Sequence, residues 1–345
     1  MKQASYLFAY FFKTIETTKL LLPGVIICLA IAGVATFLSN NYKAPVMIYA
    51  LLIGIALNFL AAKSRYNPGI QFSSSTLLRV GIAFLGLRIT IEDIHSLGLF
   101  PIVVVTSGVV LTIAFGIIVA KLMGLSKRLG IMTSGAVAIC GASAALAIAS
   151  VMPNDDKTKT ATIFTVVSVT TISTIAMVIY PIIATSLNLN AQQSGLFLGG
   201  TIHDVAQVVG AGYSVSDEVG ELSTFIKLCR VAMLIPIVVF LAAFIYRSKG
   251  PIDLVSTDSS SNQIFPFFLL GFIFFVVIGS FDLISTELKA PLSTFSSWLL
   301  VIAISALGVN TSLAEISSVG WKPLALILIS TLFIAAYIIA AIKFI

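Results

Sequence analysis

Residues 192–213 read QQSGLFLGGTIHDVAQVVGAGY, an apolar segment with a polar run in its middle. The run places His203, Asp204 and Gln207 within five positions, and apolar residues flank it on both sides. The chain of 345 residues is 58% hydrophobic and only 10% charged, with a mean hydropathy of +1.08. Ionisable groups in such a chain are costly and usually face a cavity, a partner or a substrate. The run that begins at Gly199 is therefore the first place to look for function.

The composition predicts an all-α, polytopic membrane protein. Soluble proteins carry about 25% charged residues, and several stretches here reach the roughly 20 apolar residues that cross a bilayer. A β-barrel is excluded because barrel strands alternate in polarity over about 10 residues, whereas these apolar runs are continuous. The net charge of +6 sits in short clusters between hydrophobic segments, so it does not indicate nucleic-acid binding.

Eleven hydrophobic segments can be counted, at about 20–38, 44–61, 70–90, 97–121, 129–151, 160–186, 192–213, 222–246, 264–283, 292–311 and 318–343. Residues 1–19 carry lysines and an aromatic stripe, which is typical of a helix lying on the membrane surface. Residues 20–246 hold transmembrane segments 1–8 and residues 264–345 hold segments 9–11. The polar stretch 247–263 is expected to be a cytoplasmic linker between them.

The basic residues predict the orientation by the positive-inside rule. An internal N-terminus places on the cytoplasmic side Lys2, Lys13, Lys19, Lys63, Arg65, Lys121, Lys127, Arg128, Arg247, Lys249 and Lys322. The outer loops then hold Lys43, Lys157, Lys159 and Lys289 together with the acidic residues Asp217, Glu218 and Glu221. This bias predicts a cytoplasmic N-terminus and an external C-terminus, which agrees with an odd number of spans.

An internal repeat links two distant parts of the chain. Residues 78–101 read LRVGIAFLGLRITIEDIHSLGLFP, and residues 300–323 read LVIAISALGVNTSLAEISSVGWKP, at a constant offset of 222. The match includes glycine, proline and acidic positions as well as leucines. The second copy begins seven segments after the first, so the two copies are expected to have opposite orientations. Inverted repeats are typical of secondary transporters, whose substrate sites lie near the midplane.

The seventh segment is expected to be a loosened helix that faces a substrate. On one helix His203 and Gln207 share a face, and Asp204 adjoins both. Glycines near both ends, including Gly200, favour a break in the helix. Broken helices at membrane depth line cavities, and their free N–H groups favour anions. The alternative is a buried hydrogen-bonded cluster that bridges two helices.

The fifth segment contains a second candidate, the sequence Cys140-Gly141-Ala142-Ser143. Gly141 in mid-membrane would let this helix unwind and expose backbone N–H groups. The alternative is close helix packing, which small residues permit. Cys140 is not expected to be a nucleophile because no charged activator lies nearby in the sequence.

Buried basic residues form the third candidate. Lys227 and Arg230 lie three apart in the apolar eighth segment, where each charge costs at least ~2.5 kcal/mol. They need a carboxylate partner, for which Asp204 is the obvious choice, or an anionic substrate. Asn310 in the tenth segment occupies the repeat position of Arg88.

Motifs for other chemistry are missing from the sequence. There is no Walker A, G-x-G-x-x-G, G-x-S-x-G or H-E-x-x-H pattern. The three cysteines form no C-x-x-C pair, and a histidine metal site would depend on His203 almost alone. Neither a metal nor another cofactor is therefore expected.

Five elements of the chain resemble a known family. They are Leu85-Gly86-Leu87-Arg88, Cys140-Gly141-Ala142-Ser143-Ala144, His203-Asp204-Val205-Ala206-Gln207-Val208, the pair Lys227 and Arg230 followed by Pro236, and Ala306-Leu307-Gly308. Through them nearly the whole chain resembles the YeiH-type UPF0324 membrane proteins, labelled a sulfate exporter family. The resemblance implies a multi-pass transporter of the bacterial inner membrane, similar to cation/proton antiporters and anion transporters whose two broken helices cross in mid-membrane. Asn310-Thr311 departs from the arginine expected in some members, which leaves the role of the tenth segment open.

The expected function is secondary active transport of a small anion, with sulfate or a related oxyanion or sulfonate as the substrate class. The expected substrate-binding residues are Cys140, Gly141, Ala142, Ser143, Gly200, His203, Asp204, Gln207, Lys227, Arg230 and Asn310. His203 and Asp204 are expected to couple transport to a proton, because histidine titrates near neutral pH. The expected partners are the anion, the lipid bilayer and a coupling proton or sodium ion, without nucleic acid, and a homodimer remains open.

Two other functions fit the sequence. The first is a sodium/proton antiporter with Asp204 as the cation ligand. The second is a membrane enzyme or sensor in which His203 and Asp204 form a catalytic pair. That pair would need a nucleophile or metal ligand, and the sequence offers only Cys140 or Ser143. The lack of a soluble domain argues against signalling.

Overall fold

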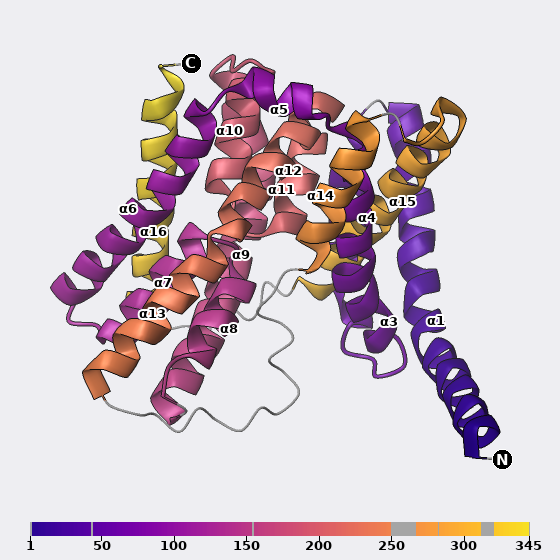
Figure 1. Ribbon diagram of the computed structural model, residues 1–345, viewed down its shortest axis with the longest axis horizontal. Coiled ribbons are helices and arrows are strands. Elements are labelled where there is room, and N and C mark those ends of the chain that lie inside the picture. Colours follow the sequence, from indigo (N-terminus) through magenta and orange to yellow (C-terminus); the bar gives the residue numbers. More distant parts are fainter. Residues whose placement is uncertain are drawn as a thin grey trace. The chain divides into compact units, whose positions relative to one another are not determined.

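The computed structural model describes residues 2–42, 44–153, 155–249, 267–281, 283–311 and 321–344, and every regular element among them is a helix (Figure 1). The chain divides into two compact units. Unit 1 comprises Met1–Leu85 and Ile284–Ser312, and unit 2 comprises Gly86–Leu283 and Leu313–Ile345. The helical membrane fold predicted from composition is confirmed.

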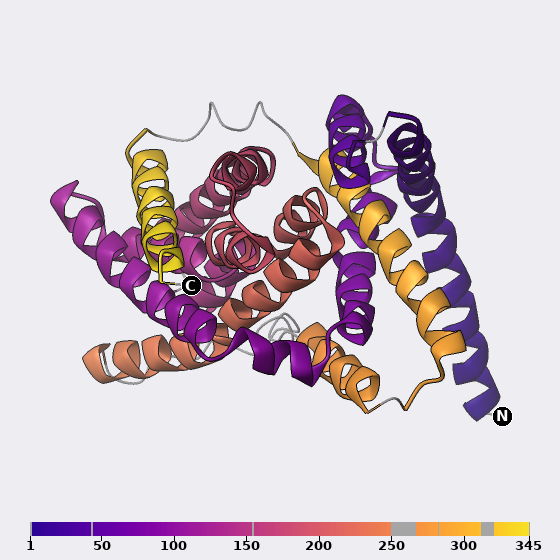
Figure 2. The same cartoon turned by 90° about the horizontal axis from the view of Figure 1, so that it is seen from above.

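Unit 1 is built on close packing between two helices. Its elements are α1 (Lys2–Tyr42), α2 (Val46–Ala56), η1 (Asn58–Leu60), α3 (Asn67–Phe72), η2 (Ser73–Leu77), α4 (Leu78–Leu85) and α15 (Thr286–Asn310). A Cβ atom on Gly54 of α2 would lie 2.5 Å from the carbonyl oxygen of Ser305 in α15. A Cβ atom on Gly308 would lie 2.4 Å from the carbonyl oxygen of Leu51. Glycine is thus required on both sides of this contact, and α1 runs alongside α15 (Figure 2).

Unit 2 contains the remaining elements. They are η3 (Gly86–Arg88), α5 (Ile91–Leu97), α6 (Phe100–Leu122), α7 (Lys127–Ala138), α8 (Ala142–Ser150), α9 (Asp156–Ser186), α10 (Ala191–Thr201), α11 (Val205–Tyr213), α12 (Asp217–Ala232), α13 (Leu234–Lys249), α14 (Phe267–Ser280) and α16 (Trp321–Ile342). Large apolar side chains such as Val103, Ile163 and Leu332 are more than 60% exposed. Helices that expose such residues are suited to a lipid environment.

Helices α7 and α8 form a hairpin, named hairpin 1, with its tip at Ile139–Gly141. If α7 and α8 formed one straight helix, the start of α7 and the end of α8 would be about 36 Å apart at 1.5 Å per residue. Instead, Arg128 at the start of α7 forms an ion pair with Asp155, which caps α9 just beyond the end of α8. The chain therefore turns back at the tip. The hydrogen bond from Arg128 holds the pKa of the Asp155 carboxyl well below its usual range, so this pair stays ionised at neutral pH.

Helices α10 and α11 form hairpin 2, with its tip at Ile202–Asp204. A Cβ atom on Gly195, early in α10, would meet Leu222 and Ser223 of α12, and one on Gly212, late in α11, would also meet Ser223. The entry to α10 and the exit from α11 thus lie beside the same part of α12. Hairpin 2 also turns back at its tip, and each of its arms is only half as long as a membrane span.

The loop ends of both hairpins carry side-chain caps. Ser126 caps α7 through its hydroxyl, which accepts from the Leu129 N–H at 3.2 Å. Asn190 and Gln193 form a reciprocal capping box at the start of α10, and Ser216 caps α12. These caps satisfy the first N–H groups of each helix and fix where it begins. These caps therefore fix the loop ends of the hairpins, whereas the tips lie inside the protein.

The count of eleven spans is not confirmed. Among the described residues seven helices are long and apolar enough to cross a membrane, and α2 and α14 are shorter apolar helices. The predicted segments 129–151 and 192–213 are the two hairpins. One topological prediction is wrong as a result. Because hairpin 1 returns to its starting side, Lys157 and Lys159 lie at the same end of unit 2 as Lys127, which strengthens the bias of positive charge toward that side.

The antiparallel packing expected of an inverted repeat is present within each unit. In unit 2, α6 packs against α16 through Ser107–Tyr337 and, further along, Phe115–Phe333. In unit 1, α4 and the turn before it pair with α15 in the same antiparallel sense. The acidic position of the second repeat copy lies in residues 312–320, and the predicted linker 247–263 lies mostly in 250–266. Both ranges are outside the described residues.

The N-terminal prediction also remains a prediction. Helix α1 continues without a break through residue 19 into the first apolar segment, so the surface location of residues 1–19 is not tested by the backbone.

The two hairpins predict a labelling pattern that distinguishes them from spanning helices. Cysteines placed by Lys127→Cys and Lys157→Cys should react with a membrane-impermeant maleimide from one side only. Cysteines placed by Gln192→Cys and Glu218→Cys should react from the opposite side. If segments 129–151 and 192–213 spanned the membrane, each pair would be split between the two sides. The native Cys28 and Cys140 are buried and Cys229 is half-buried, so their background labelling is expected to be low.

Gly54→Ala should destabilise unit 1 by about 1–3 kcal/mol, the usual cost of overpacking, because the new Cβ atom meets backbone on α15. Gly33→Ala on α1 is the matched control, since nothing lies within 4 Å of its Cβ position. Thermal unfolding in detergent, followed by size-exclusion chromatography, measures both. Equal midpoints for the two variants would contradict the close α2–α15 packing.

Candidate functional site

The tips of the two hairpins meet inside unit 2. A Cβ atom on Gly141, at the tip of hairpin 1, would lie 3.7 Å from the backbone carbon and oxygen of His203, at the tip of hairpin 2. This contact brings four helix ends together. The C-terminal ends of α7 and α10 carry partial negative charge, and the N-terminal ends of α8 and α11 carry partial positive charge.

Lys227 of α12 bridges the two tips. Its side chain is fully buried, and its ammonium group donates to the carbonyl oxygen of Ile139 at 2.6 Å and to that of Ile202 at 3.0 Å. Ile139 and Ile202 are the C-cap residues of α7 and α10, so their carbonyls lack an intrahelical donor. One cation thus satisfies an unpaired carbonyl on each hairpin.

Arg230, one turn further along α12, completes this connection. On hairpin 1 its Nε donates to the Ala138 carbonyl at 2.8 Å and its Nη2 to the Val137 carbonyl at 2.7 Å. On hairpin 2 its Nη1 donates to the carbonyls of Gly199 at 3.2 Å and Ile202 at 3.0 Å. The planar guanidinium suits this fork of acceptors better than an ammonium would. In the described part of the chain neither cation forms an ion pair with Asp204, so the carbonyls replace the carboxylate partner that the sequence led us to expect.

The start of α8 is open. Gly141 is its N-cap residue at φ 65° and ψ −126°, a left-handed conformation that favours glycine, and no side chain caps the helix. Ser143 is exposed, and its hydroxyl donates to the carbonyl oxygen and sulfur of Cys140 at 3.0 Å. Ala142 is half-buried. The start of α8 therefore has no side-chain cap, and helix N-termini of this kind are suited to anions.

The start of α11 is closed by its own carboxylate. Asp204 is the N-cap residue, half-buried, and its Oδ1 accepts from the Ala206 N–H at 2.8 Å. The hydroxyl of Ser173 on α9 accepts from the backbone N–H groups of His203 at 3.2 Å and Asp204 at 3.1 Å. The two hairpins thus differ at equivalent positions, since one N-terminus is free and the other is occupied by a negative side chain.

His203 and Gln207 do not share a helix face, contrary to the sequence interpretation, because the helix breaks at Ile202–Asp204. His203 lies 2.9 Å from the Thr331 hydroxyl of α16 through its Nε2. That hydroxyl donates to the Ile327 carbonyl at 2.7 Å, so Nε2 is assigned as the donor. Gln207 instead donates to Thr174 of α9 at 2.9 Å.

Of the other predicted site residues, Cys140 lies at a tip, and Gly200 and Asn310 do not belong to the tips. Cys140 is buried at the tip of hairpin 1 beside Ser143. Gly200 lies inside α10 against Ile338 of α16, where a Cβ atom would come within 3.0 Å of Ile338 Cδ1, so it is a packing position. Asn310 belongs to unit 1, where its amide donates to the Ser74 hydroxyl at 3.0 Å, whereas both tips belong to unit 2.

Sequence reasoning missed Ser173, Thr174 and Thr331, which hold hairpin 2. Ser173 and Thr331 bond to its tip, and Thr174 bonds to Gln207 on α11. Hydroxyl residues are frequent along α9, but most such residues bond the preceding turn of their own helix. Nothing in the sequence marks the three that reach another element. The described residues contain no group of three His, Cys, Asp or Glu side chains able to hold a metal ion.

Comparison with known proteins assigns the family. Residues 23–327 match the model of the family described as conserved hypothetical protein 698. The chain is 48% identical to the UPF0324 membrane protein CT0845 of Chlorobaculum tepidum over 93% of this chain and 88% of that protein. The chain belongs to the UPF0324 membrane protein family.

Further members are similar over comparable lengths. The UPF0324 membrane protein TauZ of Paracoccus denitrificans is 45% identical, with 92% of this chain and 93% of that protein covered. A UPF0324 membrane protein of Bacteroides thetaiotaomicron is 31% identical, with 92% and 97% covered. No solved structure matches this UPF0324 protein.

Arg230→Lys should destabilise this UPF0324 protein, because one ammonium has three N–H groups at a single nitrogen and cannot replace the four carbonyl contacts of the guanidinium. Each lost hydrogen bond to a charged group is worth roughly 1.5–3 kcal/mol, so we expect a clear drop in thermal midpoint. Arg79→Lys is the matched control, because Arg79 is exposed on α4. An Arg230→Lys midpoint equal to that of the control would mean that the guanidinium does not hold the tips.

Proposed function

We propose that this protein is a secondary active transporter of a small anion, with sulfate or a related oxyanion or sulfonate as its substrate, in the bacterial inner membrane. The observation that carries the proposal is the open N-terminus of α8 at the meeting point of two hairpin tips. Transporter sites lie near the midplane where half-helix N-termini point at anionic groups. Because Ser143 in the first turn of α8 is exposed, a solute could reach this terminus.

The charges around the tips favour an anion. Two fully buried cations, Lys227 and Arg230, stand against one half-buried carboxylate, Asp204. The partial charges of the four helix ends, about half an elementary charge each, nearly cancel. The site is left with one excess positive charge when Asp204 is ionised and two when it is protonated. A doubly charged oxyanion such as sulfate is therefore balanced when one proton enters with it.

This charge balance assigns the coupling proton to Asp204. Its carboxylate accepts a hydrogen bond from the Ala206 N–H at the start of α11. Protonation of the carboxylate would weaken that hydrogen bond and remove the negative charge nearest the incoming anion. His203 is bonded to α16 and follows Ile202, whose carbonyl accepts from both Lys227 and Arg230. A third positive charge is unfavourable there. We therefore give His203 the role of positioning the tip of hairpin 2.

The other functions have less support. Sodium/proton antiport with Asp204 as ligand would place a cation next to two buried cations. An enzyme built on His203 and Asp204 would need a nucleophile, and the nearby Ser143 hydroxyl already donates to Cys140. Antiport would appear as sodium-dependent proton movement without any dependence on the anion.

Asp204→Asn should abolish the acceleration of sulfate uptake by an acidic exterior while leaving sulfate exchange at equal pH in place, because asparagine keeps the cap but carries no titratable charge. Labelled sulfate flux into proteoliposomes, with and without a pH gradient, measures both. Asp217→Asn is the matched control, since Asp217 is exposed at the start of α12. If an acidic exterior still accelerated sulfate uptake by Asp204→Asn, Asp204 would not be the residue that carries the coupling proton.

A further inference from the structure

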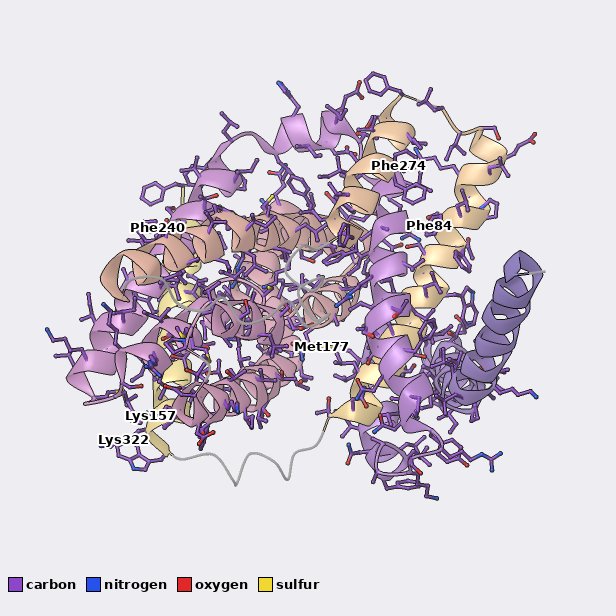
Figure 3. All side chains as sticks on the ribbon, turned by 60° about the horizontal axis from the view of Figure 1, so that its bottom comes forward. Phe84, Lys157, Met177, Phe240, Phe274 and Lys322 are labelled. Atoms are coloured by element: carbon purple, nitrogen blue, oxygen red, sulfur yellow. The ribbon has the colours of Figure 1, made fainter. Side chains whose placement is uncertain are left out.

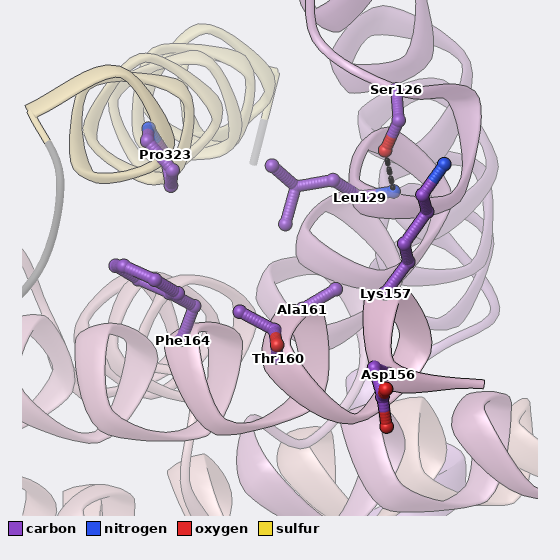
Figure 4. Close-up of a pocket in the computed structure, with 8 residues that line it drawn as sticks. All are labelled: Ser126, Leu129, Asp156, Lys157, Thr160, Ala161, Phe164 and Pro323. Carbon is purple, nitrogen blue, oxygen red and sulfur yellow. Dashed lines mark hydrogen bonds between the residues drawn. The ribbon is translucent and has the colours of Figure 1, made fainter. Parts of the chain in front are cut away.

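A second candidate site lies at the loop end of hairpin 1, at the opposite end of α7 from the tip. A groove of about 440 Å³ is lined by the starts of three helices of unit 2 (Figure 4). Its lining residues are Ser126, Leu129, Asp156, Lys157, Thr160, Ala161, Phe164 and Pro323. None of these residues belongs to the proposed anion site, so this groove needs an explanation of its own.

Lys157 lines the groove, and further basic residues belong to the same helix starts. Five basic and two acidic residues stand at these helix starts, a net charge of +3, namely Lys127, Arg128, Lys157, Lys159 and Lys322 with Asp155 and Asp156. Both carboxylates have a cation nearby, since Arg128 pairs with Asp155, and Lys159 lies 3.9 Å from Asp156. Figure 3 labels Lys157 and Lys322 at this end of unit 2, and neither forms an ion pair within the part of the chain that the structure describes.

The interior of the groove is apolar. Leu129, Phe164 and Pro323 are half-buried and line it together with the buried Ala161. Close by, Ile163 on α9 is 66% exposed and Trp321 at the start of α16 is 71% exposed. An exposed tryptophan beside basic residues is typical of the level of the lipid headgroups. The groove therefore offers positive charge at its rim and apolar surface below it.

An anionic lipid uses both properties. A free inorganic anion would gain nothing from the apolar lining, and a neutral lipid would gain little from the positive rim. A lipid with a negatively charged phosphodiester headgroup matches both, and basic grooves between helices on the cytoplasmic side are suited to such headgroups. The positive-inside bias places this end of unit 2 on the cytoplasmic side.

We propose that this groove is a binding site for an anionic phospholipid of the cytoplasmic leaflet. Its phosphate lies between Lys157 and Lys322, and one acyl chain follows Phe164 and Ile163 along α9. The proposal is independent of the transported substrate. Because the groove joins the start of hairpin 1 to the starts of α9 and α16, a bound lipid stabilises the folded protein.

The test uses the full-length protein in detergent with added phosphatidylglycerol. Native mass spectrometry measures lipid retained per chain, and thermal unfolding measures stabilisation. The double variant Lys157→Gln/Lys322→Gln should bind phosphatidylglycerol roughly 30-fold more weakly, or about 2 kcal/mol, at about 1 kcal/mol per basic residue. Lys19→Gln/Lys63→Gln removes the same charge from exposed positions elsewhere and should bind like the native protein.

Two further arms separate the possible ligands. Phe164→Ala keeps the rim charge and should weaken retention of phosphatidylglycerol, and phosphatidylcholine should give neither retention nor stabilisation. Inorganic phosphate should not displace the lipid. Equal retention by the two double variants, equal binding of phosphatidylcholine, or displacement of the lipid by phosphate would each overturn the proposal.

Discussion

The capture of hairpin carbonyls by two buried cations is the interaction on which the site depends. Two half-length hairpins cannot satisfy the carbonyls at their tips by themselves, and a membrane interior supplies no water to do so. Lys227 and Arg230 supply six hydrogen bonds to five carbonyls, shared between both hairpins. The same contacts offset both the cost of burying two charges and the cost of ending two helices inside the protein. Once the C-terminal ends are held in this way, the N-terminal ends of α8 and α11 are left facing the same small region.

The chemistry of the site follows from an asymmetry between these two N-terminal ends. Helix α8 begins at a glycine without a side-chain cap, and α11 begins at Asp204, which caps itself. An anion that binds at α8 therefore meets a resident carboxylate of the same sign across the tip contact. In the proposed mechanism, protonation of that carboxylate admits a doubly charged oxyanion and ties the entry of the anion to the entry of a proton. In that proposal the two cations make the site attractive to an anion, and the protonation state of Asp204 determines when the anion binds.

The sequence predicted the membrane class, the two unusual segments and most of the residues at the tips. Composition and segment length suffice for the class, and the cost of polar groups in apolar surroundings marks His203, Asp204, Lys227 and Arg230. The return of the chain at Gly141 and His203 could not be predicted, because a broken spanning helix and a hairpin have the same hydropathy. Backbone carbonyls have no sequence signature, so the sequence pointed to Asp204 or an anionic substrate as the partner of the cations, whereas Lys227 and Arg230 hydrogen-bond to carbonyls of both hairpins. Asn310 was chosen through the repeat, and it belongs to the other unit.

The most direct test of the central claim is the position of a bound oxyanion. Crystals of the protein grown at acidic pH and soaked in selenate, a sulfate analogue, would show the selenium atom in an anomalous difference map. The arrangement of the tips predicts a peak within hydrogen-bonding distance of the Ala142 and Ser143 N–H groups, and loss of that peak at alkaline pH. A peak confined to the Lys157 and Lys322 end of unit 2, or a peak at the tips that is indifferent to pH, would contradict the account.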